Sequence, residues 1–202
     1  PKRSSETLNW GQLLGRVTQA ASGLKSLGVS ETDRVAYILP ICTEAIVSFL
    51  AGTTAGVVVP ISPLLEAKQI SGILKLADVK VVITLKSMPK TDVAQKVSEA
   101  LKDCPSVSHL VEVDLVRYLS FPKSWIAPLI RPKVDKDHSA EVVNFEDLLA
   151  SQSTSSLTFK DEPRNRVAAM FHTGGTTGTP KLAQHTFDGM LYQGWVTTSI
   201  LP

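Results

Sequence analysis

Short apolar segments alternate with amphipathic segments along the first 115 residues, and this alternation constrains the fold more than any other feature. The apolar segments have the length and the β-branched content of buried strands, and they span 34–39, 57–61, 80–85 and 109–113. The segments between them place apolar residues on one face of a helix. Strands that alternate with helices predict an α/β fold, with a mostly parallel sheet and helices on its faces.

Capping residues fix several helix ends. Asn9 and Gly28 are suited to begin and end the first helix, whose apolar face includes Leu13, Val17 and Leu24. Thr43 is suited to cap a second helix that runs to about residue 54. Further helices are expected over 66–77, 93–101 and 144–150.

A loop rich in glycine and threonine follows the apolar run 167–171. It spans Thr173 to Lys181 and contains three glycines, four threonines, a proline and a lysine. Glycines allow backbone N–H groups to turn inward, threonine hydroxyls add neutral donors, and Lys181 adds a positive charge. Residues 181–185 are predicted to return as a strand, and Thr186 to cap the helix after it. This composition favours a hairpin that holds polyphosphate, and therefore a protein that uses a nucleotide.

The two common glycine-rich nucleotide motifs do not fit this loop. In a P-loop, four residues separate the glycines, and Ser or Thr follows the lysine. Here Gly174 and Gly178 are closer together, and Leu182 follows Lys181. The loop contains no G-x-G-x-x-G pattern either, so a dinucleotide site is not supported.

The loop instead resembles the phosphate-binding motif of the adenylate-forming (AMP-binding) superfamily, which includes acyl-CoA synthetases, luciferases and the adenylation domains of peptide synthetases. The family pattern is approximately T-[SG]-G-T-T-G-x-P-K. The resemblance extends over residues 7–115 and 163–202. Residues 171–175 and 181–186 look most like bacterial fatty-acyl-CoA synthetases, although Phe187 stands where a polar residue is common.

The resemblance implies that residues 1–202 are part of the large N-terminal AMP-binding domain. Its expected parts are an α/β scaffold over 7–115, an irregular excursion and linker over 116–165, and the phosphate-loop hairpin with the following helix over 166–202. The residues implied to bind the ATP phosphates are Thr173, Gly174, Gly175, Thr176, Thr177, Gly178 and Lys181.

For the parent protein, the resemblance implies an acid–thiol ligase that activates a carboxylic acid, and the likeness to fatty-acyl-CoA synthetases implies a fatty acid. Its implied substrates are ATP with Mg²⁺, the acid, and coenzyme A. In the family, the adenine pocket, the acidic Mg²⁺ ligand, the ribose-binding aspartate and the adenylation lysine lie downstream of this loop. A complete catalytic set is therefore not expected here, and the fragment alone is expected to be inactive. The alternatives are an enzyme for aromatic or other acids, and a non-catalytic module that keeps the fold.

Composition excludes several other classes of protein. The net charge is +2 with 20% charged residues and no basic stripe, so a nucleic-acid partner is not expected. No apolar run approaches the roughly 18 residues of a membrane span. Cys42 and Cys104 show no metal-binding or redox spacing, no metal-ligand cluster is expected, and two free thiols suit a cytoplasmic protein.

Two features leave alternatives open. Residues 121–131 are apolar with two basic residues among them, which fits either an ordered surface excursion or a peripheral membrane contact. Two prolines in this segment argue against a helix. His172 lies beside the loop, where it would be either a structural residue or a phosphate contact.

Overall fold

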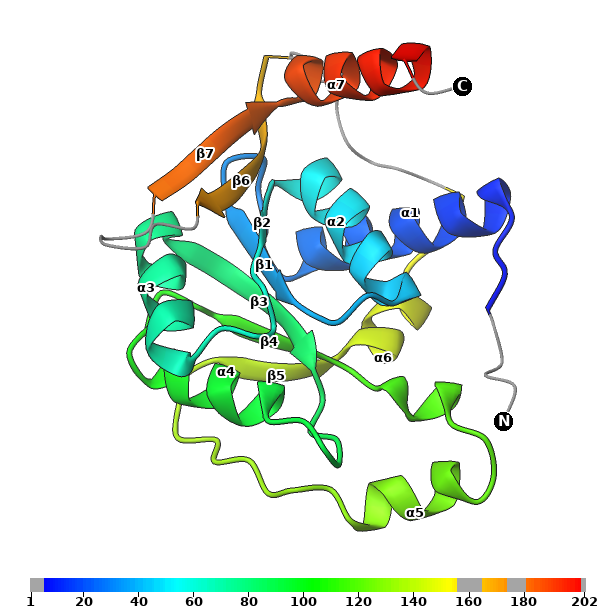
Figure 1. Cartoon of the computed structure of the whole chain (residues 1–202), viewed down its shortest axis with the longest axis vertical. Helices are drawn as coiled ribbons and strands as arrows, with labels where there is room; N and C mark the ends of the chain where they lie inside the picture. The colour runs from blue at the N-terminus through cyan, green and yellow to red at the C-terminus, as the bar shows by residue number, and fades with distance from the viewer. Residues whose placement is uncertain (1–5, 156–164, 174–180, 201–202) are drawn as a thin grey trace.

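The computed structural model describes residues 6–155, 165–173 and 181–200. One mixed sheet of seven strands runs through it in the order β5-β4-β3-β1-β2-β6-β7 (Figure 1). Every neighbouring pair is parallel except β6 and β7, which are antiparallel. The strands are β1 (Arg34–Ile38), β2 (Val57–Pro60), β3 (Val79–Leu85), β4 (His109–Val113), β5 (Glu141–Asn144), β6 (Val167–Thr173) and β7 (Lys181–Thr186). The predicted α/β class is therefore confirmed.

Helices cover both faces of the sheet. One group packs together as α1, α2 and α6, and the other group as α3 and α4 (Figure 1). Their bounds are α1 (Trp10–Ser26), α2 (Thr43–Ala55), α3 (Ala67–Ala77), α4 (Val93–Lys102) and α6 (Phe145–Ala150). The central strands are buried on both faces, as parallel sheets require, and Val35, Val58 and Val81 have no exposed surface.

The predicted helix ends can be compared with the observed caps. Asn9 forms a capping box with Gln12, through reciprocal bonds of 2.8 and 2.9 Å. Gly28 ends the helical turn with φ of 81°, a conformation that glycine adopts without strain. The prediction for Thr43 is wrong, because Cys42 occupies the N-cap and Thr43 is already helical.

The segment after β4 contains more regular structure than its sequence indicates. A 3-10 turn, η1 (Leu115–Tyr118), precedes a helix, α5 (Lys123–Leu129), and the edge strand β5 follows. The argument from prolines against a helix was therefore wrong. Pro122 stands just before the helix, where its missing N–H is not needed, and its carbonyl accepts bonds of 3.1 Å from Trp125 and Ile126. Pro128 lies inside the helix and removes a single donor.

The last described elements are the β6–β7 hairpin and the helix α7 (Phe187–Ile200). The Thr186 hydroxyl accepts a bond of 3.1 Å from the Gly189 N–H, which confirms the predicted cap. In Figure 1, α7 lies at the end of β7, beyond the helices that cover the sheet. Within the described ranges, no helix is long and apolar enough to cross a membrane.

Candidate functional site

The β6–β7 hairpin brings the two ends of the predicted phosphate loop together. Thr173 pairs with Lys181, and the Thr173 hydroxyl donates to the Lys181 carbonyl over 3.4 Å. The two strands predicted on either side of the loop are therefore present and paired. Gly174, Gly175, Thr176, Thr177 and Gly178 lie outside the described residues. Their contacts with phosphate, and those of Thr173 and Lys181, stay predictions.

An aromatic stack fixes the hairpin to the scaffold. Phe171 of β6 lies 6.4 Å from Phe49 of α2 and 5.1 Å from His185 of β7, measured between ring centroids. The His185 ring meets Phe171 edge-on at 82°, a favourable arrangement for aromatic rings. The His185 ring therefore packs against its neighbour, which is consistent with the structural role expected for this histidine. The stack places the base of the loop at a fixed position relative to α2.

A cavity of about 300 Å³ opens beside the hairpin, where β1, β2 and β6 end. Its lining comes from Tyr37 near the end of β1 and Leu39 just after it, from residues 60–63 at and beyond the end of β2, and from Phe171 and His172 of β6. In open α/β sheets, ligands bind at the carboxyl ends of parallel strands. His172 is half-buried in this lining, so it faces the same space as the base of the loop.

Tyr37, which lines this cavity, and Cys42, which lies beside Tyr37, carry no charge at pH 7. Burial raises the pKa of the Tyr37 phenol, and the neighbouring Cys42 adds to the effect. Burial also raises the pKa of the Cys42 thiol to about 11. Both groups are therefore neutral at pH 7 and do not repel a phosphate. A high thiol pKa also makes Cys42 a poor nucleophile, and both cysteines are free of disulfides.

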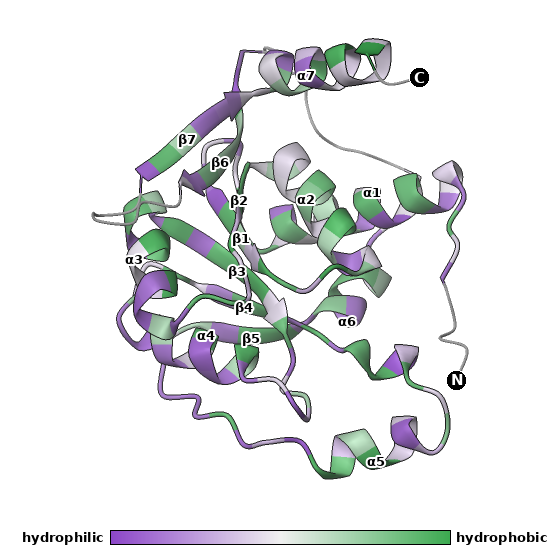
Figure 2. Ribbon diagram, viewed as in Figure 1, coloured by the Kyte–Doolittle hydropathy of each residue, from purple (hydrophilic) through white to green (hydrophobic). Residues whose placement is uncertain are grey.

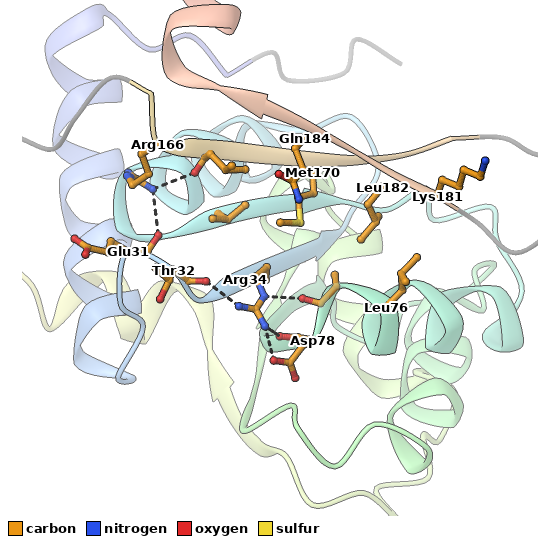
Figure 3. A pocket seen from close by; sticks show the side chains of 13 residues that line it. Glu31, Thr32, Arg34, Leu76, Asp78, Arg166, Met170, Lys181, Leu182 and Gln184 are labelled. Atoms are coloured by element: carbon orange, nitrogen blue, oxygen red, sulfur yellow. Dashed lines mark hydrogen bonds and ion pairs between the residues drawn. The ribbon is translucent and has the colours of Figure 1, made fainter.

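A larger cavity of about 720 Å³ lies beside β6 and β7 and reaches the start of β1 (Figure 3). Its two arginines are already bound to protein groups. Arg34 forms an ion pair with Asp78 and donates to the carbonyls of Ala77 and Thr32, over 2.6 and 2.9 Å. Arg166 donates to the carbonyls of Gly56 and Thr53, over 2.7 and 2.9 Å.

Because these guanidinium groups hold the backbone, they are not poised to bind phosphate. We therefore place the candidate site at the smaller cavity. Lys181 lies at one end of the larger cavity, and in Figure 3 its amino group extends away from the Arg34–Asp78 pair. The Lys181 side chain is exposed, and the chain brings it to the base of the loop through the pairing with Thr173.

Metal ligands are not assembled in this part of the protein. Among the residues that the structure describes, no group of three or more His, Cys, Asp or Glu side chains is placed to hold a metal ion. The Mg²⁺ expected to accompany ATP therefore finds no such cluster within these ranges.

Sequence reasoning identified the loop but not the cavity beside it. Tyr37 and Ser62 line that cavity, and neither stands in a recognisable motif. The available signal was their position, at or just beyond the ends of two predicted strands. That signal becomes specific only when the strand order is known, because β2 must lie between β1 and β6.

Comparison with known proteins decides the family. The profile of the AMP-binding enzyme family matches residues 2–200, which is nearly the whole chain. The chain belongs to the AMP-binding enzyme family. The expected superfamily is therefore confirmed, and so is its α/β architecture.

The relatives of this AMP-binding chain are acid–CoA ligases. It is 30% identical to a long-chain-fatty-acid–CoA ligase of Bacillus subtilis, over 91% of this chain and 33% of the relative. It is also 30% identical to an acetyl-coenzyme A synthetase of Methanothrix thermoacetophila, over 98% of this chain and 28% of the relative. The chain thus spans a third or less of the length of these relatives.

A solved structure shows the same fold. The acetoacetyl-CoA synthetase of Streptomyces lividans superposes with a TM-score of 0.75 and 22% identity, over 93% of this chain and 27% of that protein. The seven-stranded sheet of this AMP-binding chain therefore matches a portion of a larger synthetase.

Proposed function

We propose that this AMP-binding chain is part of an ATP-dependent acyl-CoA synthetase. The observation that carries the proposal is the β6–β7 hairpin, which closes a T-G-G-T-T-G-T-P-K loop at the carboxyl edge of a parallel sheet. The Thr173–Lys181 pair holds the two ends of this loop together. The similarity to acid–CoA ligases supports the same reaction class.

The proposed reaction has two steps. First, a carboxylate oxygen attacks the α-phosphorus of ATP, an O–P bond forms, and the bond to the bridging oxygen breaks to release pyrophosphate. Next, the sulfur of coenzyme A attacks the acyl carbonyl, a C–S bond forms, and the acyl–oxygen bond breaks to release AMP. The thiol proton leaves to solvent or to a base.

The hairpin suits the first step for an electrostatic reason. Several negative charges converge when a carboxylate approaches a triphosphate, so the protein must hold the β- and γ-phosphates while the α-phosphate stays open to attack. Backbone N–H groups and threonine hydroxyls bind phosphate oxygens without blocking that approach. Lys181 would offset the charge that develops on the leaving pyrophosphate. Mg²⁺ bound to ATP would supply further charge neutralisation.

A fatty acid is the proposed substrate class. Its support is the amino-acid sequence of residues 171–175 and 181–186, together with the 30% identity to a long-chain-fatty-acid–CoA ligase. Relatives of similar identity are named for acetate. The acid class is therefore the part of the proposal that a substrate panel must test.

We also propose that residues 1–202 do not complete the reaction by themselves. The support is that the chain spans a third or less of the ligases it resembles, and that the described part assembles no metal-ligand cluster. The free thiols of Cys42 and Cys104 support a reducing, cytoplasmic environment for the parent protein.

Acid-dependent exchange between ATP and labelled pyrophosphate tests the proposal directly. The complete polypeptide that contains this chain would be assayed with acetate, a long-chain fatty acid and an aromatic acid. Exchange with the fatty acid alone is the expected result. Exchange with another acid would keep the ligase and correct the substrate class. A folded protein that exchanges with no acid would overturn the proposal and favour a non-catalytic module.

A further inference from the structure

The large apolar side chains of the α5 helix face solvent and not the protein interior. Its large apolar side chains point outward: Trp125 is 76% exposed and Leu129 is 85% exposed. Ile126 and Ile130 are exposed as well, and Ala127, a small residue, faces the protein. A helix on a soluble protein normally turns its apolar stripe toward the core. Large exposed apolar patches mark surfaces that interact with proteins or membranes.

Phe121 joins this patch from the turn before the helix. Its ring is 77% exposed and lies 6.1 Å from the Trp125 ring, nearly perpendicular to it. We call the exposed side chains of residues 121–133 the α5 surface. In Figure 2, α5 is mostly green and stands at the lower margin of the molecule, away from the β6–β7 hairpin.

Both flanks of the α5 surface are tied to the domain. Before it, Arg117 of η1 forms an ion pair of 2.6 Å with the buried carboxylate of Glu44. After the helix itself, the Ser87 hydroxyl donates to the Pro132 carbonyl over 2.6 Å, and Arg131 pairs with Asp114 at 2.5 Å. These contacts hold the connecting segments, so the outward orientation of α5 is built into the fold.

The charge beside the apolar residues is positive. Residues 121–133 contain Lys123, Arg131 and Lys133 and no acidic residue. Lys123 and Lys133 are exposed, and neither forms an ion pair within the described part of the chain. A second copy of the α5 surface would bring these positive charges together, which disfavours self-association. An anionic surface that also accepts apolar side chains would match both properties.

We propose that the α5 surface docks the protein on an anionic lipid bilayer. Aromatic and aliphatic side chains would enter the boundary between headgroups and acyl chains, while Lys123 and Lys133 would remain among the headgroups. The α5 helix projects from the domain, and contacts with the domain hold the segments on either side of it. This arrangement suits shallow insertion of its side chains into a bilayer. If the proposed fatty-acid ligase is correct, docking brings the protein to the phase where its acid substrate accumulates. The docking itself does not depend on that activity.

A vesicle-binding experiment with matched tryptophan variants tests this proposal. The chain would be mixed with vesicles of phosphatidylcholine alone, or of phosphatidylcholine with phosphatidylserine, and the bound fraction measured by sedimentation. Trp125→Ser removes a tryptophan from the α5 surface. Trp195→Ser removes one from α7, where Trp195 is 65% exposed. Because both residues are exposed, neither substitution should unfold the domain, and circular dichroism would verify this.

We expect Trp125→Ser to lower the partition coefficient on mixed vesicles about tenfold, and Trp195→Ser to change it less than twofold. Lys123→Gln with Lys133→Gln should weaken binding to the mixed vesicles by about fivefold per lysine and leave the weak binding to phosphatidylcholine unchanged.

Three results would overturn the proposal. One is no binding to phosphatidylserine vesicles. Another is an equal loss for Trp125→Ser and Trp195→Ser. The third is sedimentation that depends on protein concentration without vesicles, which would assign the patch to self-association. Failure of pyrophosphate exchange, in contrast, would affect the ligase proposal alone.

Discussion

Replacing Phe171 with alanine should loosen the β6–β7 hairpin from the rest of the domain. The ladder described between β2 and β6 is a single residue pair, Val58 with Ala169, so the contact of Phe171 with Phe49 adds to an attachment that also includes the hydrogen bonds of Arg166. Phe171 is 37% exposed, so roughly two thirds of its side chain is buried. A phenylalanine buries on the order of 200 Å² when fully covered. At about 25 cal/mol per Å², the buried part contributes about 3 kcal/mol.

The expected loss is smaller, about 2 kcal/mol, because the unfolded chain already hides part of this surface. Urea denaturation would measure the change in the free energy of unfolding, and hydrogen exchange followed by mass spectrometry would locate it. Exchange should accelerate in peptides that cover β6 and β7, while peptides that cover β1 and β3 keep their protection. The control is Phe171→Leu, which retains most of the apolar area and should cost less than about 1.5 kcal/mol.

Two outcomes would refute the anchoring role of Phe171. One is a change in the free energy of unfolding below about 0.5 kcal/mol, which is the range of ordinary surface substitutions. The other is equal acceleration of exchange in β3 and in the hairpin, because that pattern would mean global destabilisation and no local attachment.

Three further predictions test the site and the scaffold. Lys181→Ala in the parent protein should slow pyrophosphate release by tenfold or more, which is on the order of the effect of losing one charge contact. Lys181→Arg is the control that conserves the charge. An unchanged rate for Lys181→Ala would show that Lys181 does not belong to the phosphate site. Burial raises the pKa of the Cys42 thiol to about 11, so its alkylation rate, taken as the difference between the protein and Cys42→Ser, should rise roughly tenfold between pH 9 and pH 10. A rise of less than about twofold, which is typical of a thiol with an ordinary pKa, would contradict this. Gly52→Ala should destabilise the domain by about 1–3 kcal/mol, because the new Cβ would lie 2.9 Å from Val58 Cγ2. The control is Gly72→Ala, whose new Cβ would have no atom within 4 Å and which should be neutral or stabilising by up to about 1 kcal/mol. Equal melting temperatures for the two variants would show that α2 and β2 are less tightly packed than described.

The sequence predicts the central part of this fold well because burial dictates the pattern there. β1, β3 and β4 are short apolar runs that helices cover on both faces of the sheet, and α3 and α4 each carry one apolar stripe. The strand β5 escapes prediction because it is a short edge strand whose residues, Glu141 to Asn144, are exposed or half-buried. Its signal is two valines among polar residues.

The helix α5 escapes prediction for a different reason. Its prolines indicate a loop by local propensity, and its apolar residues face outward, so no core-facing stripe is present. The candidate site shows the same limit at a larger scale. The loop 173–181 is recognisable from its own residues, but the cavity beside it depends on strand order, which places β1 between β3 and β2. That order arises from tertiary packing and has no local signal.

The sheet topology separates the two proposed surfaces, and this separation makes a prediction about ATP. The α5 surface leads into β5, at one edge of the sheet, and the hairpin ends in β7 at the other edge (Figure 1). Six strand spacings of about 4.8 Å place these edges about 30 Å apart. An anionic bilayer repels ATP only within a Debye length of about 8 Å at physiological salt. Vesicles that contain phosphatidylserine should therefore leave the KM for ATP in pyrophosphate exchange unchanged, even when they bind the protein. A KM for ATP that rises with phosphatidylserine content and returns to its original value at high salt would place the hairpin at the membrane. Because the strand order separates the hairpin from α5, that result would contradict docking through the α5 surface.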